Sequence, residues 1–303
     1  MSVLRIGTRD SALALWQAET VQGLLAKVQN DSVLVPVKSE GDLELTRPLY
    51  EMGITGIFTK TLDVALLAGK IDLAVHSMKD VPTALPKGLV VGAVLTRANP
   101  YDILVHKGLS FLEGQGIVGT GSLRRRAQWL ARYPKHQTEN LRGNVNTRLN
   151  TLEKSNWNGA IFAAAGLERL GLIPDSFITL SWMLPAPAQG AMVVVVREED
   201  QSTLKIVQTL NDPETSACVA MERAFLRELE GGCTAPIGAL AKREGENYRF
   251  RGALFALDGS KSVVIDKVYS GTNPEAFGIA CAREILNAEG AIILKEIRKA
   301  LGQ

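Results

Sequence analysis

Residues that can carry out chemistry gather at the end of one short apolar run, between Ile71 and Pro82. Residues 73–75 have the pattern of a buried strand, and polar side chains follow at once, among them Lys79 and Asp80. Reactive groups in open α/β sheets collect beyond the carboxyl ends of strands, so this order predicts a carboxylate and an ammonium at the mouth of a site. The alternative is a strand-to-loop turn with solvated charges.

A glycine-rich turn at residues 119–126 opens a predicted helix and is typical of an anion site. Free N–H groups and the positive end of the helix dipole favour negative charge there. Thr120 and Ser122 add hydroxyl donors, and the absence of a Gly-Lys-Ser/Thr ending disfavours a nucleotide phosphate. The helix leaves Arg124 and Arg125 free for a ligand if its core-facing residues are Leu123, Ala127, Leu130 and Ala131. The alternative is a capped helix with solvated arginines.

A second basic segment places Arg142 and Arg148 on either side of a Gly-Asn turn. Arginine binds a carboxylate or a phosphate through two parallel hydrogen bonds. Between residues 119 and 148, seven Lys and Arg residues stand against one glutamate, although the formal net charge of the chain is +2. We therefore expect a compact polyanionic ligand, with Arg9 and Lys79 pointing into the same cleft. The alternative is a set of scattered surface arginines.

Cys233 is a further candidate, because two glycines precede it and Pro236 follows. The glycines let the backbone turn and clear space around the sulfur. A thiol on such a loop is accessible and suits a nucleophile or a covalent anchor. Cys218 and Cys281 lie in helical patterns and are expected to be buried. No histidine stands in a triad context with Cys233, which argues against protease-type catalysis.

Alternating strand and helix patterns must position these groups. A chain of 303 residues exceeds the usual size of one core, so two or three domains are expected. The first part has the order of a mostly parallel α/β sheet, and a second unit starts near Tyr101. The predicted strands are 3–7, 33–37, 73–75, 103–105, 116–119, 160–163, 192–196, 248–254 and 262–269. The predicted helices are 13–28, 58–68, 123–132, 213–229, 274–288 and 291–301. Residues 192–196 are expected to return to the first sheet.

The composition excludes several classes of protein. Hydrophobic residues make up 46% and charged residues 22%, as in ordinary globular proteins. No apolar run reaches the length of a membrane span, and the N-terminus lacks the pattern of a secretion signal. Three widely spaced cysteines suit neither disulfides nor zinc, and three histidines lack metal-ligand spacing. We therefore expect a cytoplasmic protein without a metal.

Six short motifs follow one another along the chain, and together they are highly specific. They are Arg5–Arg9, Ala74–Pro82, Gly119–Arg125, Leu141–Asn144, Ala164–Leu167 and Leu229–Cys233. Through them the chain resembles the hydroxymethylbilane synthase family, also called porphobilinogen deaminase, over nearly its full length. The resemblance implies a transferase of porphyrin and heme biosynthesis that joins four porphobilinogen molecules head to tail, releasing ammonia and then the linear tetrapyrrole. It also implies a cytoplasmic monomer with no nucleic-acid or membrane partner.

The resemblance further implies an α/β fold with three domains, the first two similar to the lobes of type II periplasmic binding proteins. Their boundaries would be residues 1–97 with 191–210, residues 101–186 and residues 213–303. A dipyrromethane cofactor, made from substrate, would be thioether-linked to Cys233, and Asp80 matches the catalytic carboxylate. The matching cofactor-binding positions are Ser77, Lys79, Thr120, Ser122, Arg124, Arg125, Arg142, Asn144 and Arg148. The matching substrate-binding positions are Arg9, Ser11, Gln17, Arg169 and Gln189.

This chemistry agrees with the basic segments. Each pyrrole carries an acetate and a propionate, so the growing chain is a polycarboxylate that arginines suit. Loss of ammonia leaves an electron-poor azafulvene, which Asp80 could stabilise while assisting proton transfer.

Three positions depart from the family pattern. Thr55 stands where many members have a lysine, and Glu40 stands where an arginine or lysine is common. Residues 187–190 read Pro-Ala-Gln-Gly rather than Val-Gly-Gln-Gly. Residues 52–58 are expected to form a lid in which Thr55 offers no ammonium and Phe58 helps to cover the cleft.

Two other functions compete with this one. A non-catalytic anion-binding or solute-binding module of the same two-lobed architecture would account for the arginines, but the missing secretion signal and the Gly-Gly-Cys loop count against it. A nucleic-acid binder is disfavoured by the low net charge and by the lack of aromatic residues among the arginines. A covalent adduct of two pyrrole units, seen by intact mass, would select the enzyme.

Overall fold

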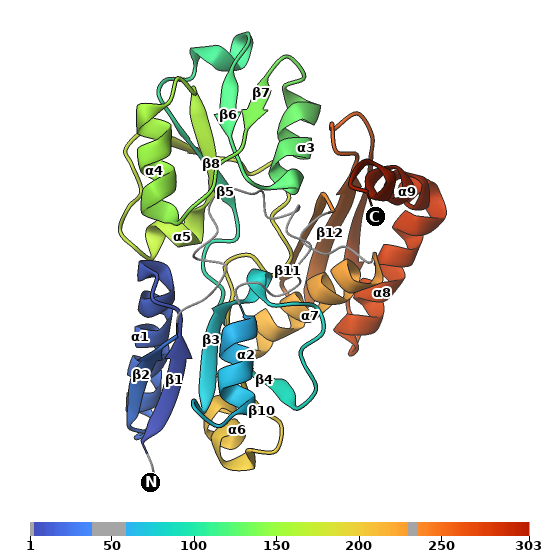
Figure 1. Cartoon of the computed structure of the whole chain (residues 1–303). Coiled ribbons are helices and arrows are strands. Elements are labelled where there is room, and N and C mark those ends of the chain that lie inside the picture. Colours follow the sequence, from blue (N-terminus) through green and yellow to red (C-terminus); the bar gives the residue numbers. More distant parts are fainter. Residues whose placement is uncertain (1–2, 38–58, 230–234, 303) are drawn as a thin grey trace.

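The computed structural model describes residues 3–37, 59–229 and 235–302 and contains three β-sheets, each packed with helices (Figure 1). The first two units lie one above the other in Figure 1, and the third, which holds the C-terminus, lies beside them. This arrangement confirms the predicted α/β fold with a smaller C-terminal unit. We propose that each sheet with its helices forms one domain, with the boundaries that the resemblance implies.

The first sheet has the strand order β2-β1-β3-β10-β4. β1, β2 and β3 are parallel as predicted, whereas β10 runs antiparallel between β3 and β4. The predicted return of residues 192–196 to this sheet is therefore confirmed. The strands are β1 (Leu4–Thr8), β2 (Ser32–Pro36), β3 (Leu73–Ser77), β4 (Leu89–Val94) and β10 (Met192–Arg197). The helices are α1 (Ala12–Lys27), α2 (Lys60–Leu67) and α6 (Gln201–Gln208).

Both faces of the first sheet are covered by helices. On one face Ile6 and Val194 pack with Val21 of α1. On the other face Val195 packs with Leu66 of α2. A sheet buried on both faces has nearly continuous apolar strands, so polar chemistry is left to the strand ends.

The second sheet has the order β7-β6-β8-β5-β9, which repeats the pattern of the first. β6 is parallel to β7 and β8, and β5 is antiparallel to β8 and β9. The two similar lobes that the resemblance implies are thus confirmed. The strands are β5 (Asp102–His106), β6 (Ile117–Gly119), β7 (Gln137–Glu139), β8 (Gly159–Ala163) and β9 (Phe177–Thr179). The helices are α3 (Leu123–Arg132), α4 (Val145–Lys154) and α5 (Ala164–Glu168).

Two segments, residues 95–101 and 184–191, cross between the first two sheets and lie side by side. The backbone N–H of Ala98 donates to the carbonyl oxygen of Gly190 at 3.1 Å. A Cβ at Gly190 would lie 2.7 Å from the carbonyl oxygen of Ala98, and the φ of Gly190 is +89°, so this position requires glycine. Ala188 also has a positive φ, of 63°, which is strained for a residue with a Cβ.

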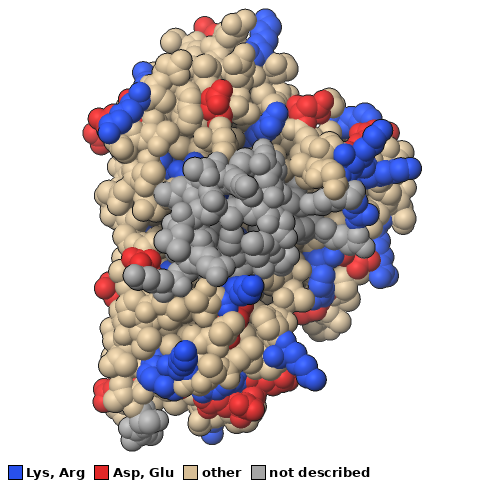
Figure 2. All heavy atoms as spheres, viewed as in Figure 1, with Lys and Arg blue, Asp and Glu red and all other residues tan. Residues whose placement is uncertain are grey.

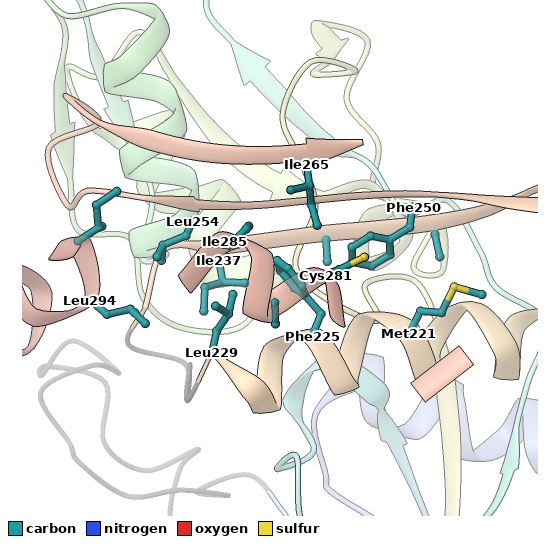
Figure 3. Packing of buried hydrophobic residues seen from close by; sticks show 14 of the residues in the cluster. Met221, Phe225, Leu229, Ile237, Phe250, Leu254, Ile265, Cys281, Ile285 and Leu294 are labelled. Atoms are coloured by element: carbon teal, nitrogen blue, oxygen red, sulfur yellow. The ribbon is translucent and has the colours of Figure 1, made fainter. Parts of the chain in front are cut away.

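The third sheet is an antiparallel meander, β11-β12-β13, with α7, α8 and α9 on one face (Figure 3). Phe225 of α7 meets Phe250 of β12 edge to face, with ring centroids 5.3 Å apart. Among the described residues, no helix combines the length and apolarity that a bilayer crossing needs. The elements are α7 (Pro213–Glu228), β11 (Ile237–Glu244), β12 (Asn247–Phe255), β13 (Ser262–Tyr269), α8 (Pro274–Ile285) and α9 (Ala291–Ala300).

Glu222 of α7 ties the third unit to both crossing segments. Its side chain is fully buried, and its Oε1 accepts hydrogen bonds from Arg97 Nη1 at 2.6 Å and from Ala241 N at 2.7 Å. Its Oε2 accepts from Arg97 Nη2 at 3.1 Å and from Ala188 N at 2.6 Å. A buried carboxylate is costly unless its lone pairs are satisfied, and these four bonds satisfy it.

Candidate active site

Asp80 lies in a single 3₁₀ turn, Met78–Asp80, that follows directly after β3. Arg223 of α7 fixes the residues behind this turn, because its guanidinium donates to the carbonyl oxygens of Val81 at 2.9 Å and Pro82 at 2.5 Å. The predicted position at the carboxyl end of a buried strand is confirmed. The turn is therefore held from two sides, by its own sheet and by the third unit.

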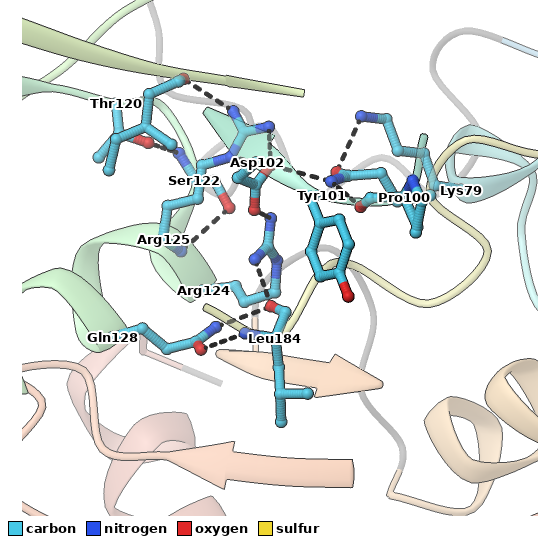
Figure 4. Close-up of polar contacts among 12 residues, drawn as sticks. Lys79, Pro100, Tyr101, Asp102, Thr120, Ser122, Arg124, Arg125, Gln128 and Leu184 are labelled. Carbon is cyan, nitrogen blue, oxygen red and sulfur yellow. Dashed lines mark hydrogen bonds and ion pairs between the residues drawn. The ribbon is translucent and has the colours of Figure 1, made fainter. Parts of the chain in front are cut away.

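Asp102, the first residue of β5, binds the two arginines that open α3 (Figure 4). Arg124 Nη2 donates to its Oδ2 at 2.7 Å, and Arg125 Nη2 donates to its Oδ1 at 2.7 Å. Arg124 and Arg125 are only 5% and 6% exposed. Contrary to expectation, these arginines are therefore not free of protein partners, and their binding of a ligand stays a prediction. They lie inside the protein, and a buried guanidinium needs a carboxylate partner.

The orientation of α3 explains this error. Leu123 and Ala127 are buried as expected, but Leu130 is only partly buried and Ala131 is exposed. Trp129 is fully buried in their place. The buried face of α3 therefore includes the two arginines of its first turn. A prediction from the positions of apolar residues alone places these arginines on the surface.

Gln189 joins this cluster to Lys79. Its Nε2 donates to Asp102 Oδ1 at 2.9 Å and to the carbonyl oxygen of Pro100 at 2.8 Å, and its Oε1 accepts from Lys79 Nζ at 3.3 Å. Burial lowers the pKa of Lys79 to about 8, although the charges of Asp80 and Asp102 act in the opposite direction. Lys79 is thus an ammonium that titrates close to neutral pH.

Arg148 extends the cationic group. Burial, followed by the charges of Arg125 and Arg142, lowers the pKa of Arg148 to about 10, while Asp80 raises it. The Nε of Arg148 donates to the carbonyl oxygen of Gly143 at 2.7 Å, which fixes the side chain at the start of α4. The charges of Asp80, Arg125 and Arg142 thus all act on Arg148, and the predicted common cleft for the two segments stays a prediction.

The polar residues predicted to support this group serve first as helix caps. Ser122 caps α3 and accepts from Arg125 N at 3.5 Å, while Thr120 Oγ1 accepts from Ser122 N at 3.3 Å. Asn144 caps α4 and accepts from Thr147 N at 2.9 Å. Capping uses the oxygen of each side chain as an acceptor, which leaves its donor groups available for an anion.

The predicted substrate residues divide between two places. Gln17 is buried and donates to Ser77 Oγ at 2.8 Å, next to the turn that carries Asp80. Ser11 caps α1, and Arg9 lies between it and β1. These residues therefore share the carboxyl edge of the first sheet with Asp80.

Arg169 instead lies against a crossing segment. Its Nη2 donates to the carbonyl oxygen of Gly190 at 2.7 Å, and its guanidinium lies 5.6 Å from the ring centroid of Trp16. Arg169 and Trp16 line a cavity of about 700 Å³ together with Leu24 and Met192. The structure thus connects Arg169 with the crossing segments rather than with the arginine pair of α3.

Asp102, Glu222 and His76 are among the buried titratable residues that the sequence analysis did not propose for the site. Burial, followed by the charge of Arg9, lowers the pKa of His76 to about 4, so its imidazole is neutral at physiological pH. Its Nε2 has no hydrogen-bond partner among the described residues. His76 interrupts an apolar strand, and that interruption is the signal that could have drawn attention to it, whereas Asp102 and Glu222 look like ordinary charged residues in the sequence.

Four residues discussed from the sequence, Glu40, Thr55, Phe58 and Cys233, lie outside the described residues. Cys233 follows Leu229, the fully buried residue directly after α7, by four positions. Within residues 3–37, 59–229 and 235–302, no three His, Cys, Asp or Glu side chains form a group that could hold a metal ion.

Basic and acidic side chains are interspersed on the face of the molecule seen in Figure 2, and they do not merge into one continuous basic surface there. The positive charge of residues 119–148 is instead partly internal, because Arg124 and Arg125 are buried. This arrangement suits a small anion in a cleft better than a polymer on a surface.

Comparison with known proteins gives consistent matches over the whole chain. The family model described as porphobilinogen deaminase, dipyromethane cofactor binding domain, matches residues 4–205, and the porphobilinogen deaminase C-terminal domain matches residues 216–287. The porphobilinogen deaminase of Desulfitobacterium hafniense is 42% identical over 309 residues, covering 99% of both chains. That of Pelotomaculum thermopropionicum is 42% identical, covering 98% of this chain and 97% of the relative.

Solved structures resemble the chain much more weakly. The Bordetella pertussis BvgS periplasmic VFT2 domain has a TM-score of 0.43 at 12% identity, covering 69% of this chain and 86% of its own. The L-cystine solute receptor of Neisseria gonorrhoeae has a TM-score of 0.39 at 11% identity, covering 69% and 84%. No conclusion rests on these two likenesses.

Proposed function

The chain belongs to the porphobilinogen deaminase family, and on that basis we propose which of its own residues carry the reaction. It is an enzyme, a transferase of porphyrin biosynthesis that joins four porphobilinogen molecules into a linear tetrapyrrole on a dipyrromethane primer and releases ammonia. We propose that Asp80 is the catalytic residue, and that the cations around it bind the carboxylates of substrate and product chain. The observation that carries this proposal is the chain of hydrogen bonds that runs from Lys79, the neighbour of Asp80, through Gln189 to Asp102 and its two arginines.

The residues present fit a dipyrromethane cofactor, because their charge is unbalanced without an anionic ligand. Within the part of the chain that the structure describes, the cluster contains five cations, Lys79, Arg124, Arg125, Arg142 and Arg148, but two carboxylates, Asp80 and Asp102. Among the described residues the buried Nε of Arg124 also lacks a hydrogen-bond partner. Carboxylates on the pyrroles would supply both the missing charge and the missing acceptors.

We propose that the cofactor is held through ion pairs by Lys79, Arg124, Arg125, Arg142 and Arg148 and through hydrogen bonds by Ser77, Thr120, Ser122 and Asn144. When bound, the dipyrromethane supplies the pyrrole carbon from which the chain is extended.

Asp80 has the position that a catalytic carboxylate needs. Positive charge develops on the substrate when ammonia leaves, and a fixed carboxylate stabilises such charge without reorganising. The same oxygen can accept a hydrogen bond from a pyrrole N–H or hold a proton in transfer. Because Arg223 anchors the turn behind it, Asp80 is held ready before the substrate binds.

We propose that Arg9, Ser11, Gln17, Arg169 and Gln189 contribute to the site of the incoming porphobilinogen. Gln17 and Gln189 do so through residues next to Asp80, since they hold Ser77 and Lys79. Arg169 would act at the crossing segments, where its bond to Gly190 links substrate binding to the relation between the lobes. We further propose that the protein is cytoplasmic, because a thiol that must stay free until the cofactor attaches requires a reducing compartment. The resemblance also supports a monomer.

Cys233 is the proposed attachment point, and intact mass tests it. Burial raises the pKa of Cys218 to about 12 and that of Cys281 to about 11, so neither forms a thiolate readily. Cys233→Ser should lose the covalent adduct of two pyrrole units. Cys218→Ser and Cys281→Ser should keep it. An adduct that persists in Cys233→Ser would refute this assignment.

A further inference from the structure

Asp102 is the most heavily bonded buried carboxylate beside the proposed site, and the function assigned above gives it no role. Its side chain is fully buried. Besides the two Nη2 donors of Arg124 and Arg125, Arg125 Nε donates to it at 3.1 Å and Gln189 Nε2 at 2.9 Å. These donors come from α3 and from a crossing segment, so Asp102 is a junction between different parts of the chain (Figure 4).

The two guanidinium groups are fixed by more than this carboxylate. Arg124 Nη1 donates to the carbonyl oxygen of Leu184 at 2.5 Å, and Arg125 Nη1 donates to that of Ile161 at 3.1 Å. Gln128 holds Leu184 in turn through two hydrogen bonds, of 2.9 Å and 2.7 Å. Both arginines therefore have a set orientation before any ligand is present, and each still has N–H groups to donate.

Asp102 also acts across the boundary between the first two units. Gln189 binds Asp102 with its Nε2 and Lys79 with its Oε1, so a chain of hydrogen bonds connects β5 with the turn that follows β3. An amide can bridge in this way only with its oxygen toward the ammonium and its nitrogen toward the carboxylate. Asp102 thus fixes the orientation of Gln189 together with the carbonyl oxygen of Pro100, which accepts from the same Nε2 at 2.8 Å.

We propose that Asp102 is a positioning residue of the enzyme: it holds Arg124 and Arg125 side by side and, through Gln189, orients Lys79 toward the same cluster of cations. The inference rests on the proposed function, in which these cations bind pyrrole carboxylates. Two buried guanidinium groups this close would repel each other without a shared carboxylate. Asp102 therefore stabilises the charged form of both guanidinium groups and fixes their orientation. This is the preorganisation that binding a polycarboxylate requires.

Asp102 remains charged throughout the working pH range. Burial alone would raise its pKa, but the charges of Arg124 and Arg125 outweigh burial and hold the pKa of Asp102 well below its usual range. The residue is therefore a fixed counter-ion rather than a pH switch.

Asp102→Asn tests the proposal, and Asp72→Asn is the matched control. Asp72 is another carboxylate that binds two arginines, with Arg5 Nη2 at 2.7 Å and Arg197 Nη2 at 3.5 Å. It precedes β3, at the end of that strand remote from Asp80. Both variants remove one charge from an arginine pair, but only Asp102→Asn does so beside the proposed site.

The first measurement is the fraction of purified protein that carries the covalent adduct after incubation with porphobilinogen, read by intact mass. Asp102→Asn should load at least tenfold less than wild type, and Asp72→Asn should load normally. For the protein that does load, KM for porphobilinogen should rise about tenfold and kcat should change less, because binding is lost before chemistry.

The second measurement is the pH profile of kcat/KM, which a purely structural role would not move. The charged groups that act on Lys79 are Asp80, Arg125, Asp102 and Arg124. Losing Asp102 removes a negative charge that raises the pKa of Lys79, so the alkaline limb should move to lower pH. Asp102→Glu keeps the charge and should leave that limb in place, while its longer side chain still raises KM.

Equal loading, KM and alkaline limb in Asp102→Asn and Asp72→Asn would overturn the proposal. If Asp102→Asn does not fold, Asp102→Glu decides, because a wild-type KM in that variant would show that the position of the carboxylate is unimportant. Failure of the underlying function would look different, since wild type itself would then carry no adduct and turn over no porphobilinogen.

Discussion

Lys79 and Asp80 are neighbours in the sequence, but their side chains have different surroundings in the structure. The ammonium of Lys79 is bonded to Gln189, and burial lowers its pKa to about 8. Asp80 is partly exposed at the end of its turn, and its charge acts on Lys79 and on Arg148. At the scale of single residues, we therefore propose that the cations bind the ligand and that Asp80 contacts the reacting atoms.

Asp80→Asn should keep the shape of the turn but lose the charge that stabilises a cationic substrate. Removing preorganised stabilisation of this kind costs on the order of a hundredfold in kcat. The measurement is steady-state turnover of porphobilinogen, with loading checked by intact mass. Asp80→Glu, which keeps the charge, should retain more activity than Asp80→Asn. Near-native turnover in Asp80→Asn would remove Asp80 from its catalytic role.

Arg142→Ala and Arg124→Ala should differ, because Arg142 is partly exposed and Arg124 is buried against Asp102. Arg142→Ala should weaken binding of the polycarboxylate by roughly 1.5–3 kcal/mol with little loss of stability. Arg124→Ala leaves a buried carboxylate short of a partner and should lower the free energy of unfolding by about 3–5 kcal/mol. Urea denaturation measures the stability, and mass spectrometry of enzyme–intermediate complexes measures elongation. Equal stability of the two variants would contradict the burial argument.

At the scale of elements, periodicity predicts this fold well where a helix or strand has one apolar face. α3 begins and ends at the predicted residues, and β3, α7 and β13 are close to prediction. β11 was not predicted, since its second half is the polar run Lys242–Glu244. The buried face of α3 was assigned wrongly because its arginines are neutralised by Asp102, a long-range contact that no local pattern reveals.

The same limit applies to the site. Asp80 could be placed from the strand that precedes it, because sheet edges collect polar groups by topology. Glu222 and Asp102 could not, since each looks like an ordinary charged residue until the fold brings its partners to it from more than 15 positions away.

The crossing segment that carries Ala188 gives a prediction at this scale. The positive φ of Ala188 costs an alanine roughly 1 kcal/mol that a glycine avoids, so Ala188→Gly should raise the free energy of unfolding by up to about that amount. Gly190→Ala should do the opposite, because its Cβ would lie 2.7 Å from a backbone oxygen. Chemical denaturation of both variants checks the signs, and a destabilised Ala188→Gly would show that the strain is absent.

At the scale of the whole molecule, α7 connects three functional regions. Glu222 binds both crossing segments, and the next residue, Arg223, anchors the turn of Asp80. The helix ends at Glu228, five positions before Cys233 in the sequence. One rigid element therefore spans from the junction of the lobes to the start of the segment that carries the proposed anchor.

The four hydrogen bonds of Glu222 also bear on how the protein melts. Its carboxylate is shared by α7, β11 and both crossing segments, so no unit can come apart without exposing a charge buried by the others. Three sheets should then unfold as one cooperative system, with equal calorimetric and van't Hoff enthalpies. Glu222→Gln turns an acceptor into a donor facing other donors, so it should lower Tm by several degrees and split the heat-capacity peak. A single heat-capacity peak in Glu222→Gln would show that other contacts, and not those of Glu222, couple the unfolding of the three sheets.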